Sequence, residues 1–187
     1  MKYLMTLSLA AAIIVGCSSN DQSNENSLRL RSDQEVSSEM IGTIDSLEKE
    51  LRAEDFKTDS EASSILMDSY LKYVSLFPGN EEKCPEYLYK AAAIARAVNL
   101  PVKAIKHYTE ILTDYPSYKN ASEAAFQIAF TYDNDLNEPE RAKEAYQSVI
   151  EKYPGDLWAE QSAERLKTID MSEDELIKML MEKNNLN

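Results

Sequence analysis

Apolar residues of this 187-residue chain recur at the spacing of amphipathic helices, in one segment after another. Between residues 122 and 132 they follow i, i+3, i+4, i+7, which places Ala125, Ile128, Ala129 and Tyr132 on one helical face. After the polar turn 134–138, a second apolar face is formed by Ala142, Ala145, Tyr146, Val149 and Ile150. The pair Tyr153-Pro154 ends it, because the residue before a proline disfavours the helical conformation. The pattern therefore predicts two helices across residues 122–154.

The same pattern returns at a fixed interval. Three aromatic-proline pairs stand 38 residues apart: Phe77-Pro78, Tyr115-Pro116 and Tyr153-Pro154. Apolar positions repeat upstream of the first two pairs, at Leu66, Tyr70, Tyr73 and Val74, and at Tyr87, Ala91, Ile94, Ala104, Tyr108, Ile111 and Leu112. A weaker stripe opens the array, with Met40, Ile44, Leu47 and Leu51. A period of this length predicts an all-α solenoid of antiparallel helix pairs, with repeats at about 38–78, 83–116 and 121–154. Only four glycines and no alternating apolar pattern leave almost no case for strands.

Residues 156–187 are expected to be helices that cap the array. Leu157, Ala159, Ala163 and Leu166 would form the apolar face of the first one. Ser172 and Glu175 have the spacing of a capping box that opens a last helix, with Leu176, Ile177, Met179 and Leu180 as its apolar residues. Two interpretations of this last helix are open. It folds back onto the array as a cap, or it is offered to a partner's groove, where methionines suit adaptable contacts.

The first sixteen residues have the features of a signal peptide. Met1-Lys2 supplies the positive end, and the apolar stretch from Tyr3 to Val15 is far shorter than the roughly 20 residues of a membrane-spanning helix. The run Ile14-Val15-Gly16-Cys17 resembles the bacterial lipobox, in which the cysteine thiol is diacylated and the chain is cut before it. An ordinary secretory signal with a chance cysteine is the alternative. The resemblance implies a mature chain that begins at an acylated Cys17 and is held to a membrane by lipid.

The composition of the chain predicts a flexible tether before a folded domain, and its acidic charge argues against some classes of partner. Residues 17–35 are polar and carry too few large apolar residues to fold by themselves, so a flexible tether is expected there, followed by one domain at 36–187. The chain has 33 acidic and 20 basic side chains, a net charge of −13. Loss of residues 1–16 removes one lysine and makes it −14. Such a balance argues against nucleic acid and against electrostatic attachment to anionic lipid.

Residue types that carry chemistry do not form a convincing catalytic, metal or cofactor site. His107 is the only histidine and falls at a scaffold position of the repeat. Asp133, Asp135, Asn137 and Glu144 match positions 1, 3, 5 and 12 of a calcium loop, but Glu138 stands where the loop needs glycine. Cys84 would be the only free thiol if Cys17 is acylated, and it lacks the second cysteine of a redox motif. We therefore expect no enzyme, no metal and no cofactor.

The spacing of small and aromatic residues resembles the tetratricopeptide repeat. In that family two antiparallel helices fill about 34 residues, with small and large residues at fixed positions and a closing proline. The small residues match Ala91 and Ala129 in the first helix and Ala104 and Ala142 in the second, and the aromatic residues match Tyr108 and Tyr146. Four extra residues per repeat look like the periplasmic branch of the family. That branch includes the lipoprotein of the outer-membrane barrel-assembly machine and the Tol-Pal coordinator type.

The resemblance implies a function and a binding face. It implies a non-enzymatic scaffold that binds a protein or peptide partner in the cell envelope, and Ser18 after the lipid cysteine suits sorting to the outer membrane, facing the periplasm. An accessory or ligand-binding subunit of a polysaccharide or cell-wall enzyme system is the alternative. Family positions of the concave face fall on Leu88, Ala92, Ala95, Glu123, Phe126, Phe130 and Asp133. The two phenylalanines beside carboxylates would suit an apolar peptide with a basic residue, unless they pack against the neighbouring repeat.

Overall fold

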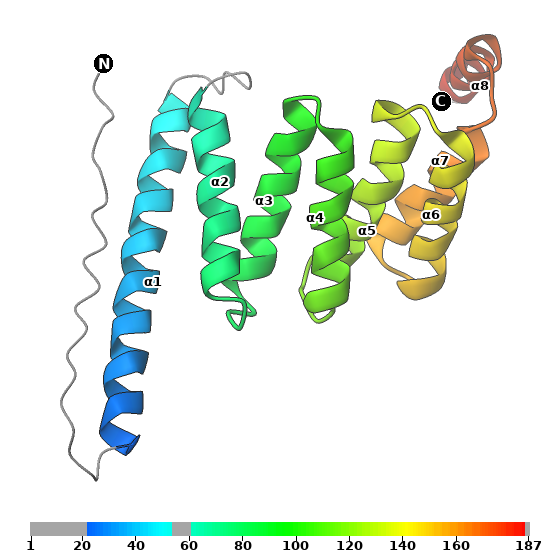
Figure 1. Cartoon of the computed structure of the whole chain (residues 1–187). Helices are drawn as coiled ribbons and strands as arrows, with labels where there is room; N and C mark the ends of the chain where they lie inside the picture. Colours follow the sequence, from blue (N-terminus) through cyan, green and yellow to red (C-terminus); the bar gives the residue numbers. More distant parts are fainter. Residues whose placement is uncertain (1–21, 54–60, 186–187) are drawn as a thin grey trace. The chain divides into compact units, whose positions relative to one another are not determined.

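The computed structural model describes residues 22–53 and 61–185, and every regular element in these ranges is a helix (Figure 1). The helices are α1 (Gln22–Ala53), α2 (Glu61–Leu76), α3 (Lys83–Ala97), α4 (Pro101–Asp114), α5 (Ala121–Phe130), α6 (Pro139–Lys152), α7 (Leu157–Thr168) and α8 (Glu173–Asn185). A short π-helix, η1 (Thr131–Asp135), continues α5. Residues 37–187 form one compact unit, and the described residues 22–36 fall in a second unit. The predicted signal peptide and the lipid acceptor Cys17 lie outside the described residues.

Consecutive helices of the unit 37–187 pack against one another as antiparallel neighbours, from α2 with α3 through to α6 with α7 (Figure 1). The second helix of each pair ends at the same repeat position, at Leu76, Asp114 and Lys152, which are 38 residues apart. The all-α helical repeat fold predicted from the sequence period is confirmed. No helix in the described ranges has both the length and the apolar character needed to cross a membrane.

Repeated turn residues explain why the helices stop where they do. Tyr115 and Tyr153 are the C-caps of α4 and α6, and each precedes a proline that disfavours a further helical residue. Between the two helices of a pair, Asn99 and Asn137 have positive φ angles of 59° and 53°. Asparagine is one of the few residues with a side chain that adopts this left-handed conformation at modest cost. A proline then opens α4 and α6, where its missing N–H does no harm.

Two clusters of buried side chains hold the helices together. The first joins α1, α2, α3 and α4 around the fully buried rings of Tyr73, Tyr87 and Tyr108. The second joins α5, α6 and α7 through Phe126, Ala129, Ala142 and Tyr146. All four alanines that the repeat pattern placed between paired helices have no exposed surface: Ala91, Ala104, Ala129 and Ala142. Their small side chains let the helix backbones approach, and the tyrosines fill the remaining space.

The backbone conformation before the compact unit differs from the predicted tether, whereas the unit itself begins at Ser37, next to the predicted start of the domain at residue 36. Sequence analysis assigned residues 17–35 to a flexible segment, but residues 22–35 belong to α1. The stretch from residue 18 to residue 41 contains neither glycine nor proline, so nothing in it interrupts a helix. The packed half of α1 supplies the costly first turn, and each further residue then adds a hydrogen bond at low cost. Low hydrophobicity was therefore a poor guide to backbone conformation here.

The entry to α7 corrects another expectation. Leu157 was placed on the apolar face, but it is 60% exposed. Its neighbour Trp158 turns inward instead, and its ring lies 4.9 Å from that of Phe126. The side chain of Asp156 caps the helix by accepting a hydrogen bond from the Trp158 N–H at 2.8 Å. This cap fixes the register of α7 and brings the tryptophan, not the leucine, against α5.

The predicted capping box at the start of α8 is present. The N–H and hydroxyl groups of Ser172 donate to Glu175 Oε2 at 2.8 and 2.7 Å, and the Glu175 N–H points back to Ser172 Oγ at 3.4 Å. These hydrogen bonds lower the pKa of the Glu175 carboxyl group. On α8, Leu176 and Met179 are half-buried, whereas Ile177, Leu180 and Met181 are largely exposed. Neither interpretation of this helix, as a cap or as a partner helix, is decided by that mixture.

Candidate functional site

Four of the seven residues predicted for the concave face lie inside the protein. Leu88 and Phe126 are 2% and 8% exposed, and Ala92 and Ala95 have no exposed surface. They are buried because α3 has helices on both sides, α2 and α4, and Phe126 faces Trp158 and Tyr146. The residues of α3 that reach solvent lie about one position further along the helix than predicted. Lys90 and Arg96 are half-buried, and Ala93 is exposed. Direct contact with a partner remains a prediction for Glu123, Phe130 and Asp133, which are partly exposed.

Ion pairs and ring contacts connect the first helices of successive pairs into one row. We call this the first-helix row: α1 from Ser37 onward, α3, α5 with η1, and α7. Its charged and polar members are Glu48, Lys90, Tyr89, Glu123, Arg96, Gln127, Asp133, Asp135 and Arg165. Each contact bridges two helices that are far apart in sequence, so the row is a rigid surface built from several repeats.

Phe130 lies between two arginines at the centre of this row. The guanidinium carbon of Arg96 is 4.8 Å from the ring centroid, and that of Arg165 is 5.7 Å away. Both distances are within the range of a cation–π interaction. The Phe130 ring also stacks on Phe126, with centroids 6.1 Å apart. Guanidinium groups from α3 and α7 therefore both contact this ring.

Carboxylates of the π-helix hold both arginines in place. Asp135 accepts two hydrogen bonds from Arg96, from Nε at 2.6 Å and from Nη2 at 3.3 Å. Asp133 accepts from Arg165 and, at 3.2 Å, from the hydroxyl of Tyr146. The wider turn of η1 is closed by the Leu136 N–H, which donates to the Thr131 carbonyl at 3.0 Å, five residues earlier. Asp133 and Asp135, which stand at positions 1 and 3 of the calcium-like spacing, therefore bind arginines.

A second carboxylate of the predicted face is also engaged within the protein. The hydroxyl of Tyr89 donates to Glu123 Oε1 at 2.7 Å, across α3 and α5. Burial and this hydrogen bond raise the pKa of Tyr89 above its ordinary value, so the hydroxyl stays a donor. Glu123 and Asp133 therefore both have partners within the protein, while a carboxylate can accept further hydrogen bonds from a bound peptide. The preference for a basic residue stays a prediction.

Glu48 ties α1 to α2 and α3. Its Oε1 accepts from the hydroxyl of Tyr70 at 2.7 Å and from Lys90 Nζ at 2.8 Å, and its Oε2 pairs with Arg52 at 2.8 Å. Burial alone would raise the pKa of the Glu48 carboxyl group, but the hydrogen bonds from Lys90 and Tyr70 outweigh it and lower the pKa. The other side of Lys90 pairs with Glu86 at 2.7 Å. Beside this group lies an apolar pocket of about 180 Å³.

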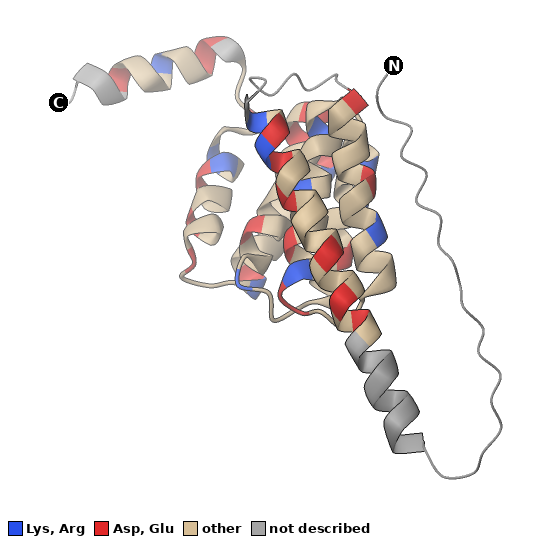
Figure 2. Cartoon of the chain, turned by 90° about the vertical axis from the view of Figure 1, so that its left-hand side faces the viewer, with Lys and Arg blue, Asp and Glu red and all other residues tan. Residues whose placement is uncertain are grey.

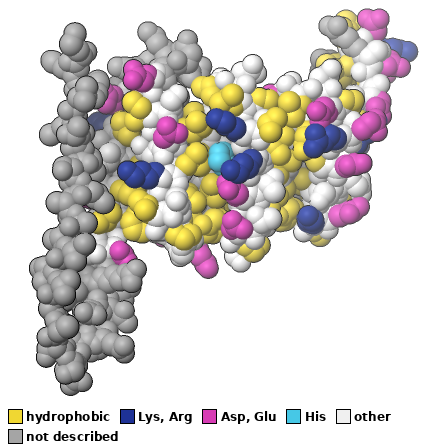
Figure 3. Space-filling view, in the orientation of Figure 1, with side chains coloured by type: hydrophobic (Ala, Val, Ile, Leu, Met, Phe, Trp, Pro, Cys, Tyr) yellow, Lys and Arg dark blue, Asp and Glu magenta, His cyan; other side chains and the backbone are white. Residues whose placement is uncertain are grey.

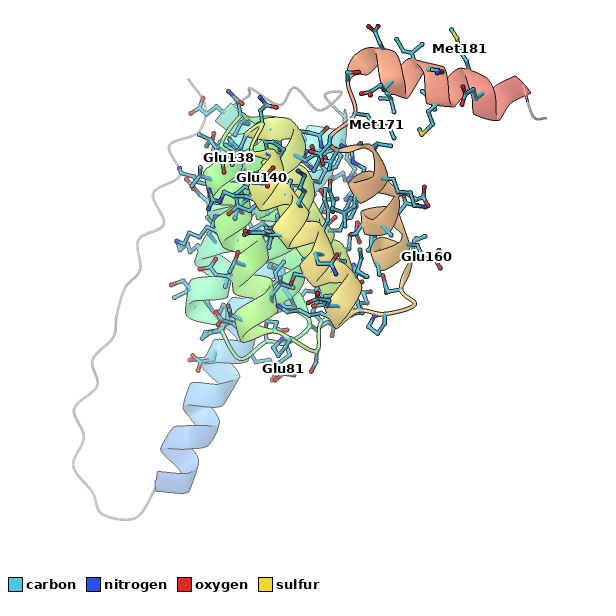
Figure 4. The ribbon with its side chains drawn as sticks, turned by 90° about the vertical axis from the view of Figure 1, so that its right-hand side faces the viewer. Glu81, Glu138, Glu140, Glu160, Met171 and Met181 are labelled. Atoms are coloured by element: carbon cyan, nitrogen blue, oxygen red, sulfur yellow. The ribbon has the colours of Figure 1, made fainter. Side chains whose placement is uncertain are left out.

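The remaining charge is spread over the helices (Figure 2). Exposed carboxylates such as Glu81 and Glu160 point away from the helices into solvent (Figure 4). On the face seen in Figure 3, apolar side chains lie between charged ones and do not gather in one large patch.

His107 and Cys84, the candidate catalytic residues of the sequence, are both buried and contact residues of the fold. His107 is 6% exposed, with Nδ1 2.9 Å from Glu110 Oε2. Cys84 is buried, its sulfur is 3.1 Å from the Phe77 carbonyl oxygen, and burial raises the pKa of the thiol. Within the part of the chain that the structure describes, His, Cys, Asp and Glu side chains form no group of three or more suited to a metal ion.

Residues 123–156 match the model of the tetratricopeptide repeat family. The match covers α5, η1 and α6, the pair in which the sequence pattern was clearest. This part of the chain is a tetratricopeptide repeat, and helical repeat folds of this kind are typically non-catalytic. No curated protein matches the chain at a significant level.

Sequence reasoning missed the arginines and lysine of the first-helix row. Arg96, Arg165 and Lys90 do not recur at the 38-residue period. Each of them forms an ion pair with a residue of another helix, and these pairs differ from one repeat to the next. Charged residues on a helix look alike in a sequence whether they meet solvent or a neighbouring helix. No signal in the sequence distinguishes these three residues from charges that face solvent.

Proposed function

We propose that this chain is a membrane-anchored adaptor of the bacterial cell envelope that binds a protein or peptide partner and catalyses no reaction. The observation that carries the proposal is the tetratricopeptide repeat at residues 123–156, within a stack of helix pairs of the same period. Stacked helical repeats provide extended surfaces for protein–protein interaction. In this proposal the first-helix row is the binding face, with Phe130 and its two arginines at the centre.

The proposed anchor is lipid on Cys17. It is supported by the order of features in the sequence: a positive end, a short apolar stretch and the run Ile14-Val15-Gly16-Cys17. Several acyl chains hold a protein stably at a membrane, so the acidic surface need not bind lipid. Ser18 after the cysteine supports the outer membrane, facing the periplasm, as the location. The helix from residue 22 to the packed domain would then begin close to the lipid.

Two measurements test the proposal in the native host. The intact mass of the purified chain should include acyl groups, and Cys17→Ala should leave an unlipidated precursor or a water-soluble form. A wild-type chain that is water-soluble and carries no lipid would contradict the anchor.

The adaptor role is tested by reversible crosslinking in membranes, followed by mass spectrometry. We expect one envelope protein to be recovered reproducibly with the wild-type chain. Ala129→Pro is the control, because proline inside α5 breaks the helix and should abolish capture of a partner that needs the folded repeat. Equal recovery with this variant would contradict binding by the repeat fold. Recovery of glycan in place of protein would instead favour an accessory subunit of a polysaccharide enzyme system.

A further inference from the structure

An apolar pocket of about 180 Å³ opens between α1, α2 and α3. Leu66 and Tyr70 are almost fully buried at 2% exposure each, and Ile94 is half-buried. Ala93 also lines the pocket and is exposed, so one side of the pocket is open to solvent. The charged residues Glu48, Arg52 and Lys90 complete the lining.

The size of the pocket suits a single side chain. A cavity of about 150 Å³ with an aliphatic and aromatic lining holds a benzene molecule and stays free of water when empty. A branched aliphatic or an aromatic side chain is therefore of the right size for this pocket. Burial of such a side chain against Ala93 and Ile94 would remove apolar surface from water on both partners, and the nearly buried Leu66 and Tyr70 would add packing contacts.

The charges around the pocket differ in how far they reach solvent. The side chain of Glu48 is only 12% exposed and is bonded to Arg52, Lys90 and Tyr70. Lys90 is 34% exposed and has Glu48 and Glu86 on either side. Arg52 is 67% exposed, and its guanidinium can bind a second carboxylate beside the one it already holds. The most exposed of the charged side chains that line the pocket is therefore Arg52, a positive one.

We propose that this pocket accepts one apolar side chain of a partner peptide, while a carboxylate next to that side chain pairs with Arg52. The proposal rests on the adaptor function proposed above and names the chemistry of its partner. The net charge of −13 would slow the approach of an acidic segment. Salt at physiological concentration screens charges beyond about 8 Å, however, so Arg52 governs the bound state more than distant carboxylates do.

The test uses the full chain purified from membranes in detergent and three fluorescein-labelled peptides. The first carries one leucine with two aspartates on each side, the second has lysines in place of the aspartates, and the third has alanine in place of the leucine. Fluorescence polarisation reports binding. We expect the first peptide to bind roughly tenfold or more tightly than the third, as burial of a leucine side chain predicts. The second should bind more weakly than the first.

Variants of the chain assign the binding to the pocket. Ala93→Trp fills the open side of the pocket and should weaken binding of the first peptide at least tenfold. Ala97→Trp is the matched control, since Ala97 is also exposed on α3 but does not line the pocket, and it should leave binding within about twofold. Arg52→Gln should abolish the preference for aspartate over lysine. A photoreactive leucine in the first peptide should crosslink to the segment that contains Ala93 and Ile94.

Several results would overturn the proposal. Tighter binding of the lysine peptide would reverse the charge preference, and normal binding by Ala93→Trp would place the peptide elsewhere. A change of oligomeric state in Ala93→Trp would make a second copy of the chain the occupant. If Ala93→Trp still captures the envelope partner, the pocket proposal fails while the adaptor function stands. If no partner is captured by the wild type, the adaptor function itself fails.

Discussion

The hydroxyl of Tyr115 donates a hydrogen bond to the carbonyl oxygen of Pro78, at 2.9 Å. Both residues belong to the aromatic-proline pairs that mark the 38-residue period, and the contact joins the closing turn of one repeat to that of the repeat before it. The first pair carries phenylalanine at this position, Phe77, which has no preceding pair to reach. The contact therefore gives a physical reason why Tyr115 carries a hydroxyl group and Phe77, at the equivalent position of the repeat before it, does not.

Tyr115→Phe should lower the free energy of unfolding by about 0.5–1.5 kcal/mol, because the hydrogen bond is lost and the partly buried carbonyl keeps no partner from this side chain. Urea denaturation followed by circular dichroism measures the change. Tyr153→Phe, one repeat further on, shows what loss of a hydroxyl costs at the same repeat position without the bond to Pro78. Equal effects of the two substitutions would show that the bond contributes nothing of its own.

Tyr87→Phe should have the opposite sign. The Tyr87 side chain is 1% exposed, and its hydroxyl has no hydrogen-bond partner among the described residues. Burial also raises the pKa of this hydroxyl. A buried hydroxyl without a partner is destabilising, so its removal should leave the free energy of unfolding unchanged or raise it by about 1 kcal/mol. The same urea experiment decides it, and a clear loss of stability would mean that the hydroxyl is hydrogen-bonded in solution.

The repeat fold could be predicted from the sequence, because its determinants are local and periodic. Ala91, Ala104, Ala129 and Ala142 recur where two helices must approach closely, and all four are buried. An alanine at one of these repeat positions has the same packing role in every repeat. The helices of the repeats accordingly end where the aromatic-proline pairs placed their ends.

The surface could not be predicted in the same way. Leu88 and Ala92 were assigned to an open face, yet a shift of about one residue around α3 puts them in the core and leaves Ala93 exposed. Neighbouring positions on a helix are about 100° apart, so a small error in register exchanges surface for interior. The partners of Arg96 and Arg165 lie on other helices and outside the period, and no sequence pattern identifies them.

Glu48→Gln should make the free energy of unfolding depend less on pH in the acid range. The folded-state pKa of Glu48 is lowered below its ordinary value of 4.5, so its charge stabilises the fold above about pH 4.5, and this contribution is lost as the pH falls through the folded pKa. The variant should be less stable than the wild type at pH 7, by roughly 1 kcal/mol, and the difference should shrink below pH 4.5. Urea denaturation at several pH values measures both. Glu160→Gln, at an exposed position, is the control (Figure 4). A difference that stays constant with pH would show that the charge of Glu48 is not what stabilises the contact.

Phe126→Ala and Phe130→Ala should separate the core of the repeat from its proposed binding face. Phe126 packs against the rings of Trp158, Tyr146 and Phe130, so its truncation should cost about 3–5 kcal/mol of unfolding free energy.

Phe130 is half-buried and held by two arginines, so its truncation should cost less, about 1–2 kcal/mol, and leave the chain folded. Thermal melts measure the stability of both variants, and crosslinking in membranes measures partner capture. A Phe130→Ala chain that is folded and only slightly destabilised but has lost capture would support a binding role for this ring. Equal destabilisation by the two substitutions would assign Phe130 to the core as well. Capture that survives in a folded Phe130→Ala chain would move the partner's contact away from the two arginines, toward the pocket beside Ala93 or the exposed side of α8.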